Sequence, residues 1–342
     1  MEILIIHPGG LGDIVLSLPA VASLRNRFPA ARVTVAGNID HLVPVMSGYA
    51  ERILSLSALP LHLLYAPGSV PESVVKFWRS YDRIISWTGG GDREFARKFK
   101  DIHPNVMVAS WRPAPAERRH VSRLFWDSLD IGIHSETAAA FAPILLESEL
   151  SNEGKRWLGA QGWNGRDPLT ALHPGAGSRI KRWPASRFME LAQHLALKEK
   201  HKLLIIEGSA ERGLAEQIVS ALPSGAAIVL DAMSLNLLAA VVAHCDLFVG
   251  NDSGVAHLAA ALKVRCVVLF GPTLPQHWAP LGHDVRVLRL TQGCEGCVSG
   301  GNNHTCLENI TVEEVIRNSR LEIRNGVSSK KGESISILFP RL

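Results

Sequence analysis

A single carboxylate follows three glycines near the start of the chain, in the stretch HPGGLGD at residues 7–13. Gly9, Gly10 and Gly12 permit backbone angles and a close approach that a Cβ would forbid. Asp13 follows them at the expected start of a helix, where a carboxylate aimed at a substrate could act as a general base. Asp is also a favoured helix-capping residue, so a purely structural role for Asp13 is equally consistent with this stretch.

The glycines do not match the common nucleotide-binding motifs. A dinucleotide fingerprint needs a third, correctly spaced glycine and an acidic residue after the second strand, and neither is present. A phosphate-binding Walker loop needs G-K-[ST], which is missing as well.

A second polar cluster lies within residues 246–273, where an apolar run ends at Gly250 and is followed by Asn-Asp-Ser-Gly. The backbone N–H groups at the start of the next helix, together with the helix dipole, suit a phosphate or diphosphate. Ser253 and His257 are four residues apart and therefore share a helix face. A capping Ser or Asp beside a surface histidine would give the same pattern.

A basic, glycine-containing loop follows another apolar run, in LHPGAGSRIKRWP at residues 172–184. It carries Arg179, Lys181 and Arg182, and Pro184 suits the first turn of a following helix. A lysine presented from such a loop could neutralise a departing phosphate, whereas the alternative is a basic loop that is simply solvated.

Short apolar, β-branched runs alternate with helical patterns along the whole chain. Because the apolarity of these runs is continuous, the strands should be covered on both faces, as in a parallel sheet with crossover helices. The sequence therefore predicts an α/β protein. The nine predicted strand segments are residues 2–6, 31–37, 82–87, 106–110, 169–175, 202–208, 226–231, 246–250 and 266–271.

The stretch LGAQGWNGRDP at residues 158–168 reads as a linker rich in Gly, Asn and Pro. It separates an expected N-terminal domain, residues 1–157, from an expected C-terminal domain, residues 168–325. Residues 311–323 predict an amphipathic helix, and residues 326–342 form a tail. The tail begins with a polar stretch that is expected to be loose and ends with ISILFPRL, which is apolar but too short to assign.

Composition excludes several classes of protein. The chain has 342 residues, 46% of them apolar, and a net charge of +4, which is too mild for a nucleic-acid-binding protein. No signal-peptide pattern and no apolar run of about 18 residues is present, so we expect a cytoplasmic protein without a membrane span. The five cysteines are expected to be thiols.

Taken together, GGLGDIVLSLPAVASLRNRFP, HPGAGSRIKRWP, NDSGVAHLAAAL with FGPT, and a late C-x2-C…C resemble the ADP-heptose:lipopolysaccharide heptosyltransferases of glycosyltransferase family nine. The resemblance runs in register over nearly the whole chain. It implies the GT-B architecture, in which two Rossmann-like domains with parallel sheets face each other across a cleft that holds the active site.

The resemblance also implies roles for individual residues. Asp13 matches the catalytic base, beside Gly12, and Lys181 matches the lysine on the donor phosphate. Met233 matches the position whose backbone meets adenine, and Glu211 the acidic residue near the ribose, with Glu207 as the alternative. The segment that holds the diphosphate and the heptose is matched by Asp252, Ser253, Gly254 and His257.

The implied acceptor is the anionic inner core of lipopolysaccharide, and the implied location is cytoplasmic, with peripheral contact at the inner membrane surface. An arginine-rich segment after the fourth predicted strand could bind this acceptor through Arg112, Arg118, Arg119 and Arg123. Asp92, which follows another strand, is the alternative base if Asp13 only caps its helix.

Transfer with inversion needs a base on one side of the sugar carbon and stabilisation of the departing diphosphate on the other. No D-x-D motif occurs, so the sequence predicts a transferase that uses ADP-heptose and requires no metal or other cofactor. Cys294, Cys297, His304 and Cys306 could bind zinc, but packing of thiols in a loop is the favoured interpretation. The Cys-rich tail favours a member that adds the second heptose.

Competing functions explain fewer of the motifs. A nucleotide-sugar epimerase of the same shape would use the helix-start anion site but not the basic acceptor segment. A transferase of a different sugar in the same family, an NAD-dependent oxidoreductase and a sugar-binding protein without activity are further alternatives. The oxidoreductase would need the missing dinucleotide fingerprint.

Overall fold

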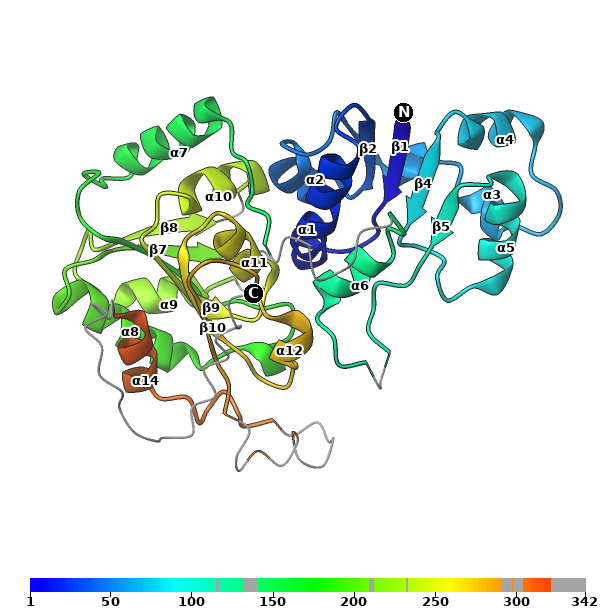
Figure 1. The fold of residues 1–342 in the computed structure, drawn as a ribbon. Coiled ribbons are helices and arrows are strands. Elements are labelled where there is room, and N and C mark those ends of the chain that lie inside the picture. The colour runs from blue at the N-terminus through cyan, green and yellow to red at the C-terminus, as the bar shows by residue number, and fades with distance from the viewer. Residues whose placement is uncertain are drawn as a thin grey trace. The chain divides into compact units, whose positions relative to one another are not determined.

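The computed structural model describes residues 1–114, 117–131, 141–208, 212–231, 233–290, 294, 297 and 304–320. The chain divides into two compact units, Met1–Leu146 and Glu147–Leu342. Each unit contains a parallel sheet with helices packed against it (Figure 1), so the predicted α/β class is confirmed.

The first unit contains a five-stranded parallel sheet in the order β3-β2-β1-β4-β5. Its helices lie in the crossovers, as parallel strands require. The strands are β1 (Glu2–Ile6), β2 (Arg32–Gly37), β3 (Arg52–Ser55), β4 (Arg83–Ser86) and β5 (Val106–Val108). The helices are α1 (Leu11–Arg27), α2 (Ile39–Met46), η1 (Leu56–Ala58), α3 (His62–Tyr65), α4 (Glu72–Arg79), α5 (Arg93–Ile102) and α6 (Val121–Asp127).

The second unit contains a six-stranded parallel sheet in the order β11-β10-β9-β6-β7-β8. This is the strand order of a doubly wound Rossmann fold. The strands are β6 (Leu169–His173), β7 (Lys202–Glu207), β8 (Ala227–Asp231), β9 (Leu247–Asn251), β10 (Arg265–Leu269) and β11 (Val285–Leu288). The helices are α7 (Ser148–Ala160), η3 (Arg179–Lys181), α8 (Ala185–Leu197), α9 (Leu214–Ser220), α10 (Leu235–Val242), α11 (Gly254–Ala261), α12 (Pro275–Trp278) and α14 (Val312–Ser319).

The central strands are buried on both faces, which is why their sequences are continuously apolar. Ile3, Leu4, Ile5 and Ile6 of β1 are fully buried, and all five residues of β6 are buried, with only His173 slightly exposed. At about 25 cal/mol per Å² of buried apolar surface, such strands supply much of the driving force for folding.

The boundary between the units lies earlier than the sequence indicated. Residues 147–157 were assigned to the N-terminal domain, but α7 packs against α10 of the second unit. Gly154 marks this packing, because a Cβ there would lie 2.3 Å from the backbone oxygen of Ala240. The loop at residues 161–168 therefore lies within the second unit, and the linker prediction was wrong.

The sequence missed two strands, β3 and β11. Each has four residues and lies at an edge of its sheet, with half of its residues or more incompletely buried. Edge strands of this kind lack the continuous apolar run that marks central strands. In the part of the chain that the structure describes, no helix combines the length and apolarity needed to cross a bilayer.

Candidate active site

The predicted residues gather at the switch point of each sheet. In a doubly wound sheet, ligands bind beyond the carboxyl ends of the two adjacent strands from which the chain winds in opposite directions. In the first unit these strands are β1 and β4, and in the second unit β6 and β9. The glycine stretch follows β1, the Lys181 loop follows β6, and the Asn-Asp-Ser-Gly stretch begins at the last residue of β9.

The glycine stretch folds tightly around Asp13. Helix α1 begins at Leu11, two residues before the predicted start, so that Asp13 lies in its first turn. The Asp13 carboxylate accepts a hydrogen bond of 2.9 Å from the backbone N–H of Gly10. A Cβ at Gly9 would lie 2.6 Å from the Cβ of Asp13, so only glycine fits there. Asp13 therefore has the capping role, and this role is compatible with the proposed role as a base.

His7, which directly follows β1, stabilises this loop through a hydrogen bond. It is fully buried, its ring lies 5.1 Å from that of Trp87 and 5.3 Å from that of Phe125, and its Nδ1 accepts a hydrogen bond from Gly9 N–H. Burial lowers the pKa of His7 to about 3, so the imidazole is neutral at physiological pH. A neutral ring is needed here, because Nδ1 can accept only when it carries no proton.

Asp92, the alternative base, follows β4 as the N-cap of α5. Its Oδ1 accepts hydrogen bonds from the backbone N–H groups of Glu94, at 2.9 Å, and Phe95, at 3.0 Å. Both bonds satisfy amides at the helix start. Capping of α5 therefore gives Asp92 a structural role that requires no substrate.

The second unit pairs the predicted donor lysine with a predicted donor carboxylate. Lys181 Nζ lies 2.8 Å from Oδ2 of Asp252, whose side chain is 7% exposed while that of Lys181 is 32% exposed. Ser253 caps α11 through its side chain, and Gly254 is the first residue of that helix. Asp252 thus fixes the ammonium group of Lys181 at the end of β9. The first backbone N–H groups of α11 follow Asp252 in sequence, and such groups have no acceptor within their own helix.

His257 lies close to this ion pair, since the charges of Asp252 and Lys181 both act on its ring. The residue is 4% exposed, and its Nδ1 is buried with no hydrogen-bond partner among the described residues. Burial lowers the pKa of His257 to about 4, the charge of Asp252 opposes this shift, and that of Lys181 adds to it. The ring is therefore neutral at pH 7 and can exchange hydrogen bonds with a hydroxyl-rich ligand.

Asn251 holds both ends of the Lys181 loop, a role that sequence reasoning missed. Its Nδ2 donates to the carbonyl oxygens of Pro174, at 2.8 Å, and Gly175, at 3.2 Å. Its Oδ1 accepts from the backbone N–H of Trp183 at 2.9 Å. Asn251 is fully buried, and the signal available in the sequence was an amide side chain at the end of an otherwise apolar strand.

Two of the remaining donor predictions can be placed in the structure. Met233 is half-buried directly before Ser234, the N-cap of α10, and Gly12 is half-buried in the first turn of α1. Glu211 lies outside the described residues. Its alternative, Glu207, accepts a hydrogen bond of 2.8 Å from the backbone N–H of Ala215 at the start of α9.

The predicted acceptor arginines differ in their surroundings. Arg119 forms ion pairs with Glu117, at 2.7 Å, and Asp127, at 2.6 Å, and a side-chain hydrogen bond from Arg119 lowers the pKa of Glu117 to about 2. Arg112 lies over the ring of Trp111, with Cζ 5.2 Å from the ring centroid. Arg118 is exposed and Arg123 is half-buried.

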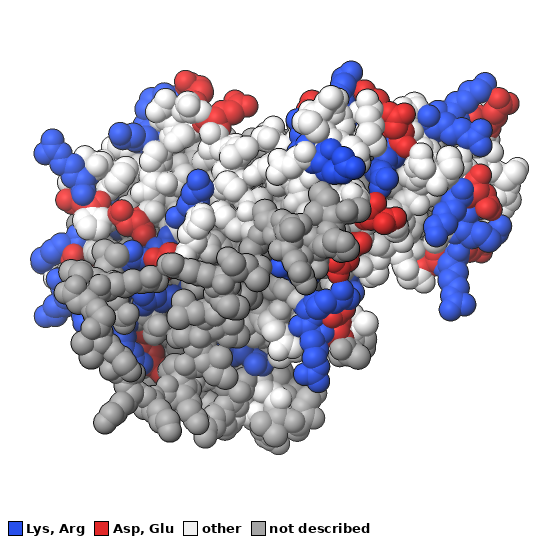
Figure 2. Space-filling model, in the orientation of Figure 1, with Lys and Arg blue, Asp and Glu red and all other residues white. Residues whose placement is uncertain are grey.

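In the coloured part of Figure 2, basic and acidic side chains lie near one another in several places, separated by uncharged surface. Arg119, with its two ion pairs, gives another example of such mixing.

The relatives of the chain decide its family. A sequence profile described as "Glycosyltransferase family 9 (heptosyltransferase)" matches residues 138–307. A lipooligosaccharide heptosyltransferase 2 from Campylobacter jejuni is 32% identical, over 95% of this chain and 99% of the relative. The chain belongs to glycosyltransferase family 9. A lipopolysaccharide heptosyltransferase 2 from Salmonella typhimurium is 25% identical, over 92% of this chain and 97% of the relative.

Solved structures agree on the fold of this family 9 glycosyltransferase. ADP-heptose lipopolysaccharide heptosyltransferase II of E. coli matches with a TM-score of 0.71 at 22% identity, covering 93% of this chain and 97% of the other. A family 9 glycosyl transferase from Veillonella parvula matches with a TM-score of 0.75 at 21% identity, covering 93% and 95%. The chain is thus a glycosyltransferase of GT-B fold, as predicted.

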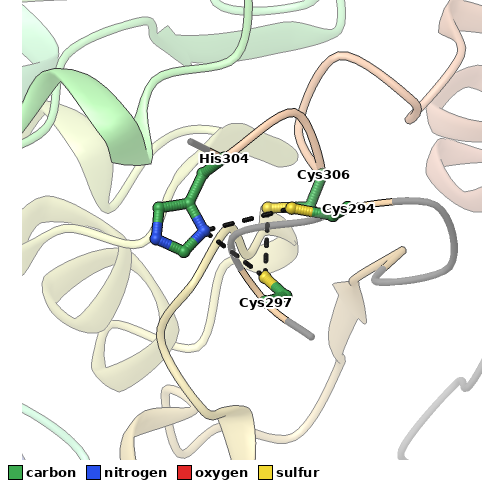
Figure 3. Close-up of side chains that lie close together, drawn as sticks. All are labelled: Cys294, Cys297, His304 and Cys306. Atoms are coloured by element: carbon green, nitrogen blue, oxygen red, sulfur yellow. Dashed lines mark hydrogen bonds between the residues drawn. The ribbon is translucent and has the colours of Figure 1, made fainter. Parts of the chain in front are cut away.

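Four residues of the glycosyltransferase that sequence reasoning assigned to loop packing lie together between β11 and α14. Figure 3 shows the side chains of Cys294, Cys297, His304 and Cys306 converging, and we call them the Cys3His cluster. Burial would raise the pKa of Cys294, but hydrogen bonds from the backbone N–H groups of Cys297 and Thr305 and from neighbouring side chains lower it to about 6.

Proposed function

We propose that this glycosyltransferase transfers a heptose from ADP-L-glycero-D-manno-heptose to the inner core of lipopolysaccharide, with inversion at the transferred carbon. One observation carries the proposal: relatives aligned over more than nine-tenths of both chains are named lipopolysaccharide or lipooligosaccharide heptosyltransferase 2. The same names favour addition of the second heptose.

The donor diphosphate belongs to the second unit in this proposal. Lys181 offers a cation, and the start of α11 at Ser253 and Gly254 offers backbone N–H groups and the positive end of a helix dipole. These groups stabilise the charge that grows on ADP as the glycosidic bond breaks, which is electrostatic catalysis by preorganised donors. Asp252 fixes the lysine, and His257 contacts the heptose hydroxyls.

The remaining donor contacts follow the resemblance. The backbone at Met233 meets the adenine, and Glu211 meets the ribose.

The first unit supplies the base. Asp13 accepts the proton of the acceptor hydroxyl while the hydroxyl oxygen attacks the sugar carbon and the bond to the diphosphate breaks. A single displacement of this kind inverts the configuration at that carbon. The bond from Gly10 N–H occupies one carboxylate oxygen and fixes the orientation of the group, while Gly12 leaves the backbone close to the substrate.

The acceptor side rests on Arg112, Arg118, Arg119 and Arg123, which would pair with carboxylates and phosphates of the inner core. Because the acceptor is anchored in a lipid layer, we propose peripheral contact of the enzyme with the cytoplasmic face of the inner membrane. We further propose that the transfer needs no metal, since Lys181 and the start of α11 provide the charge that a cation would otherwise provide.

Two measurements test this function. Purified protein incubated with ADP-heptose and defined truncated acceptors should release ADP and lengthen one acceptor by a single heptose. In parallel, ADP should raise the melting temperature, whereas UDP and NAD at equal concentration should not. No transfer to any heptose-containing or Kdo-containing acceptor, or stabilisation by UDP instead of ADP, would refute the proposal.

A further inference from the structure

The Cys3His cluster lies in the segment that joins β11 to α14, outside the proposed active site. Cys294 and Cys306 are buried, and Cys297 and His304 are half-buried. The ligand atoms of all four residues lie within 4.8 Å of one another, although Cys294 and Cys297 are separated in sequence from His304 and Cys306. Figure 3 shows the three sulfur atoms and the imidazole Nδ1 directed toward a common centre.

Three of the ligand–ligand distances in the cluster are close to those of a tetrahedral metal site. Bonds of about 2.3 Å to sulfur and about 2.0–2.1 Å to nitrogen place tetrahedral ligands about 3.8 Å apart for sulfur pairs and about 3.6 Å apart for sulfur and nitrogen. The distance from Cys297 Sγ to Cys306 Sγ is 3.8 Å, and that from Cys297 Sγ to His304 Nδ1 is 3.6 Å. The distance from Cys294 Sγ to His304 Nδ1 is 4.0 Å.

We propose that the Cys3His cluster binds one structural divalent zinc ion. Three thiolates and one imidazole form a donor set that zinc prefers, and four protein ligands leave no open position for a substrate. The three sulfur atoms bind as thiolates, so each thiol that is still protonated releases its proton to solvent, and the complex has a net charge of −1 with the His304 proton on Nε2. No electron is transferred, and the site takes no part in sugar transfer.

The position of the cluster explains what such an ion would stabilise. The segment continues from Cys306 to Leu307 and Ile310, which are buried in the core of the second unit. The carbonyl oxygen of Ile310 accepts hydrogen bonds from Trp183 Nε1, at 2.9 Å, and from Arg187 Nη1. Trp183 is two residues after Lys181, so a metal ion that fixes this segment would also stabilise the C-terminal end of the Lys181 loop through the bond between Trp183 and Ile310.

Metal content tests the proposal independently of activity. The full chain, purified with a thiol reductant and without added metal, should contain about one zinc per chain by mass spectrometry. Exchange for Co²⁺ should give the intense visible ligand-field absorption of tetrahedral cobalt, with a sulfur-to-cobalt charge-transfer band in the near ultraviolet. Removal of zinc by a chelator should lower the melting temperature, and zinc should restore it.

A matched set of variants separates the cluster from the other thiols. C297S/C306S should lose zinc and the cobalt spectrum, with affinity falling by more than about 100-fold, beyond the range of a lost outer-shell contact. C245A removes a buried thiol outside the cluster and should keep one zinc per chain. The wild-type measurements stand by themselves if the double variant fails to fold.

Other results would overturn the proposal. They are a reduced wild-type protein that binds neither zinc nor cobalt, zinc that is retained by C297S/C306S, or iron as the bound ion. A disulfide between Cys297 and Cys306 in the purified protein, with no metal after its reduction, would do the same. None of these results depends on transferase activity, so the proposed function is tested separately.

Discussion

The two units present polar residues at equivalent positions of their sheets but prepare them in opposite ways. Beyond β1, the loop is built on a neutral, buried imidazole and three glycines, with the Asp13 carboxylate hydrogen-bonded to the Gly10 amide. Beyond β9, the candidate site is built on charge, with Lys181 held by the buried Asp252 and with the start of α11 following in sequence. In the proposed function, the same topology would support a proton acceptor in one unit and an anion site in the other.

The difference shows that strand order fixes where ligands bind but not what they are. Burial keeps the His7 ring neutral, so its Nδ1 accepts a hydrogen bond, whereas the buried carboxylate of Asp252 fixes the position of the Lys181 side chain. Breaking each arrangement should therefore affect different steps of the reaction.

The largest effect is expected for Asp13→Asn. The amide oxygen can still accept from Gly10 N–H, so that the loop and the melting temperature are preserved, but the side chain can no longer take a proton. Turnover should fall by about 10²- to 10⁴-fold with ADP binding near normal. Initial rates and ADP titrations measure both quantities.

Asp92→Asn is the control for Asp13, since it changes a second helix-start carboxylate of the same unit. It should retain turnover. If Asp92→Asn were the inactive variant and Asp13→Asn the active one, the base would be Asp92.

Lys181→Ala should weaken the donor half of the reaction. A charge-assisted hydrogen bond contributes about 1.5–3 kcal/mol, so donor affinity and turnover should each fall by about 10- to 100-fold. The substitution also leaves the buried Asp252 without its partner, so the melting temperature should decrease. Lys155→Ala, at an exposed lysine of α7, is the control and should leave donor affinity, turnover and melting temperature unchanged. An unchanged donor affinity for Lys181→Ala would contradict the phosphate role.

Asn251→Ala tests whether the Lys181 loop needs its anchor. Two carbonyls and one amide would lose a buried partner, which costs about 1–3 kcal/mol of unfolding free energy. As a positioning residue, Asn251 should affect KM for the donor more than KM for the acceptor. Asn318→Ala removes one side-chain hydrogen bond in α14 and should leave both KM values unchanged. Equal changes in the two KM values for Asn251→Ala would indicate a purely structural role.

At neutral pH the smallest effect is expected for His7, because its titration is seen only in the pH dependence of stability. The pKa of His7 is about 3 in the folded state and about 6.5 when unfolded, so the unfolded chain binds the extra proton between these values. Unfolding free energy should therefore fall as pH decreases from 6.5 toward 3.

His7→Asn keeps an acceptor for Gly9 N–H but does not titrate, so it should reduce the slope of stability against pH. His257, with a pKa of about 4, acts in the same direction and keeps part of the slope. Chemical denaturation at several pH values measures this, and an unaltered slope in His7→Asn would contradict the assignment.

Much of the fold was predictable because burial leaves a direct trace in sequence. Nine strands were located from continuous apolar runs, and these runs include every central strand of both sheets. The edge strands β3 and β11 left no such trace. The domain boundary was misplaced because α7 has few buried residues, and only its contact with α10 shows which unit it belongs to.

The candidate site was predictable to a similar degree. The sequence by itself determined that Asp13, Lys181 and the Asp252–Gly254 stretch follow strands, because Gly-rich loops and helix starts are local features. Only the tertiary structure decided that Lys181 pairs with Asp252, that Asn251 ties together the two ends of a distant loop, and that three thiols and an imidazole converge. These contacts join residues 7 to 77 positions apart, and packing rather than local propensity brings such residues together.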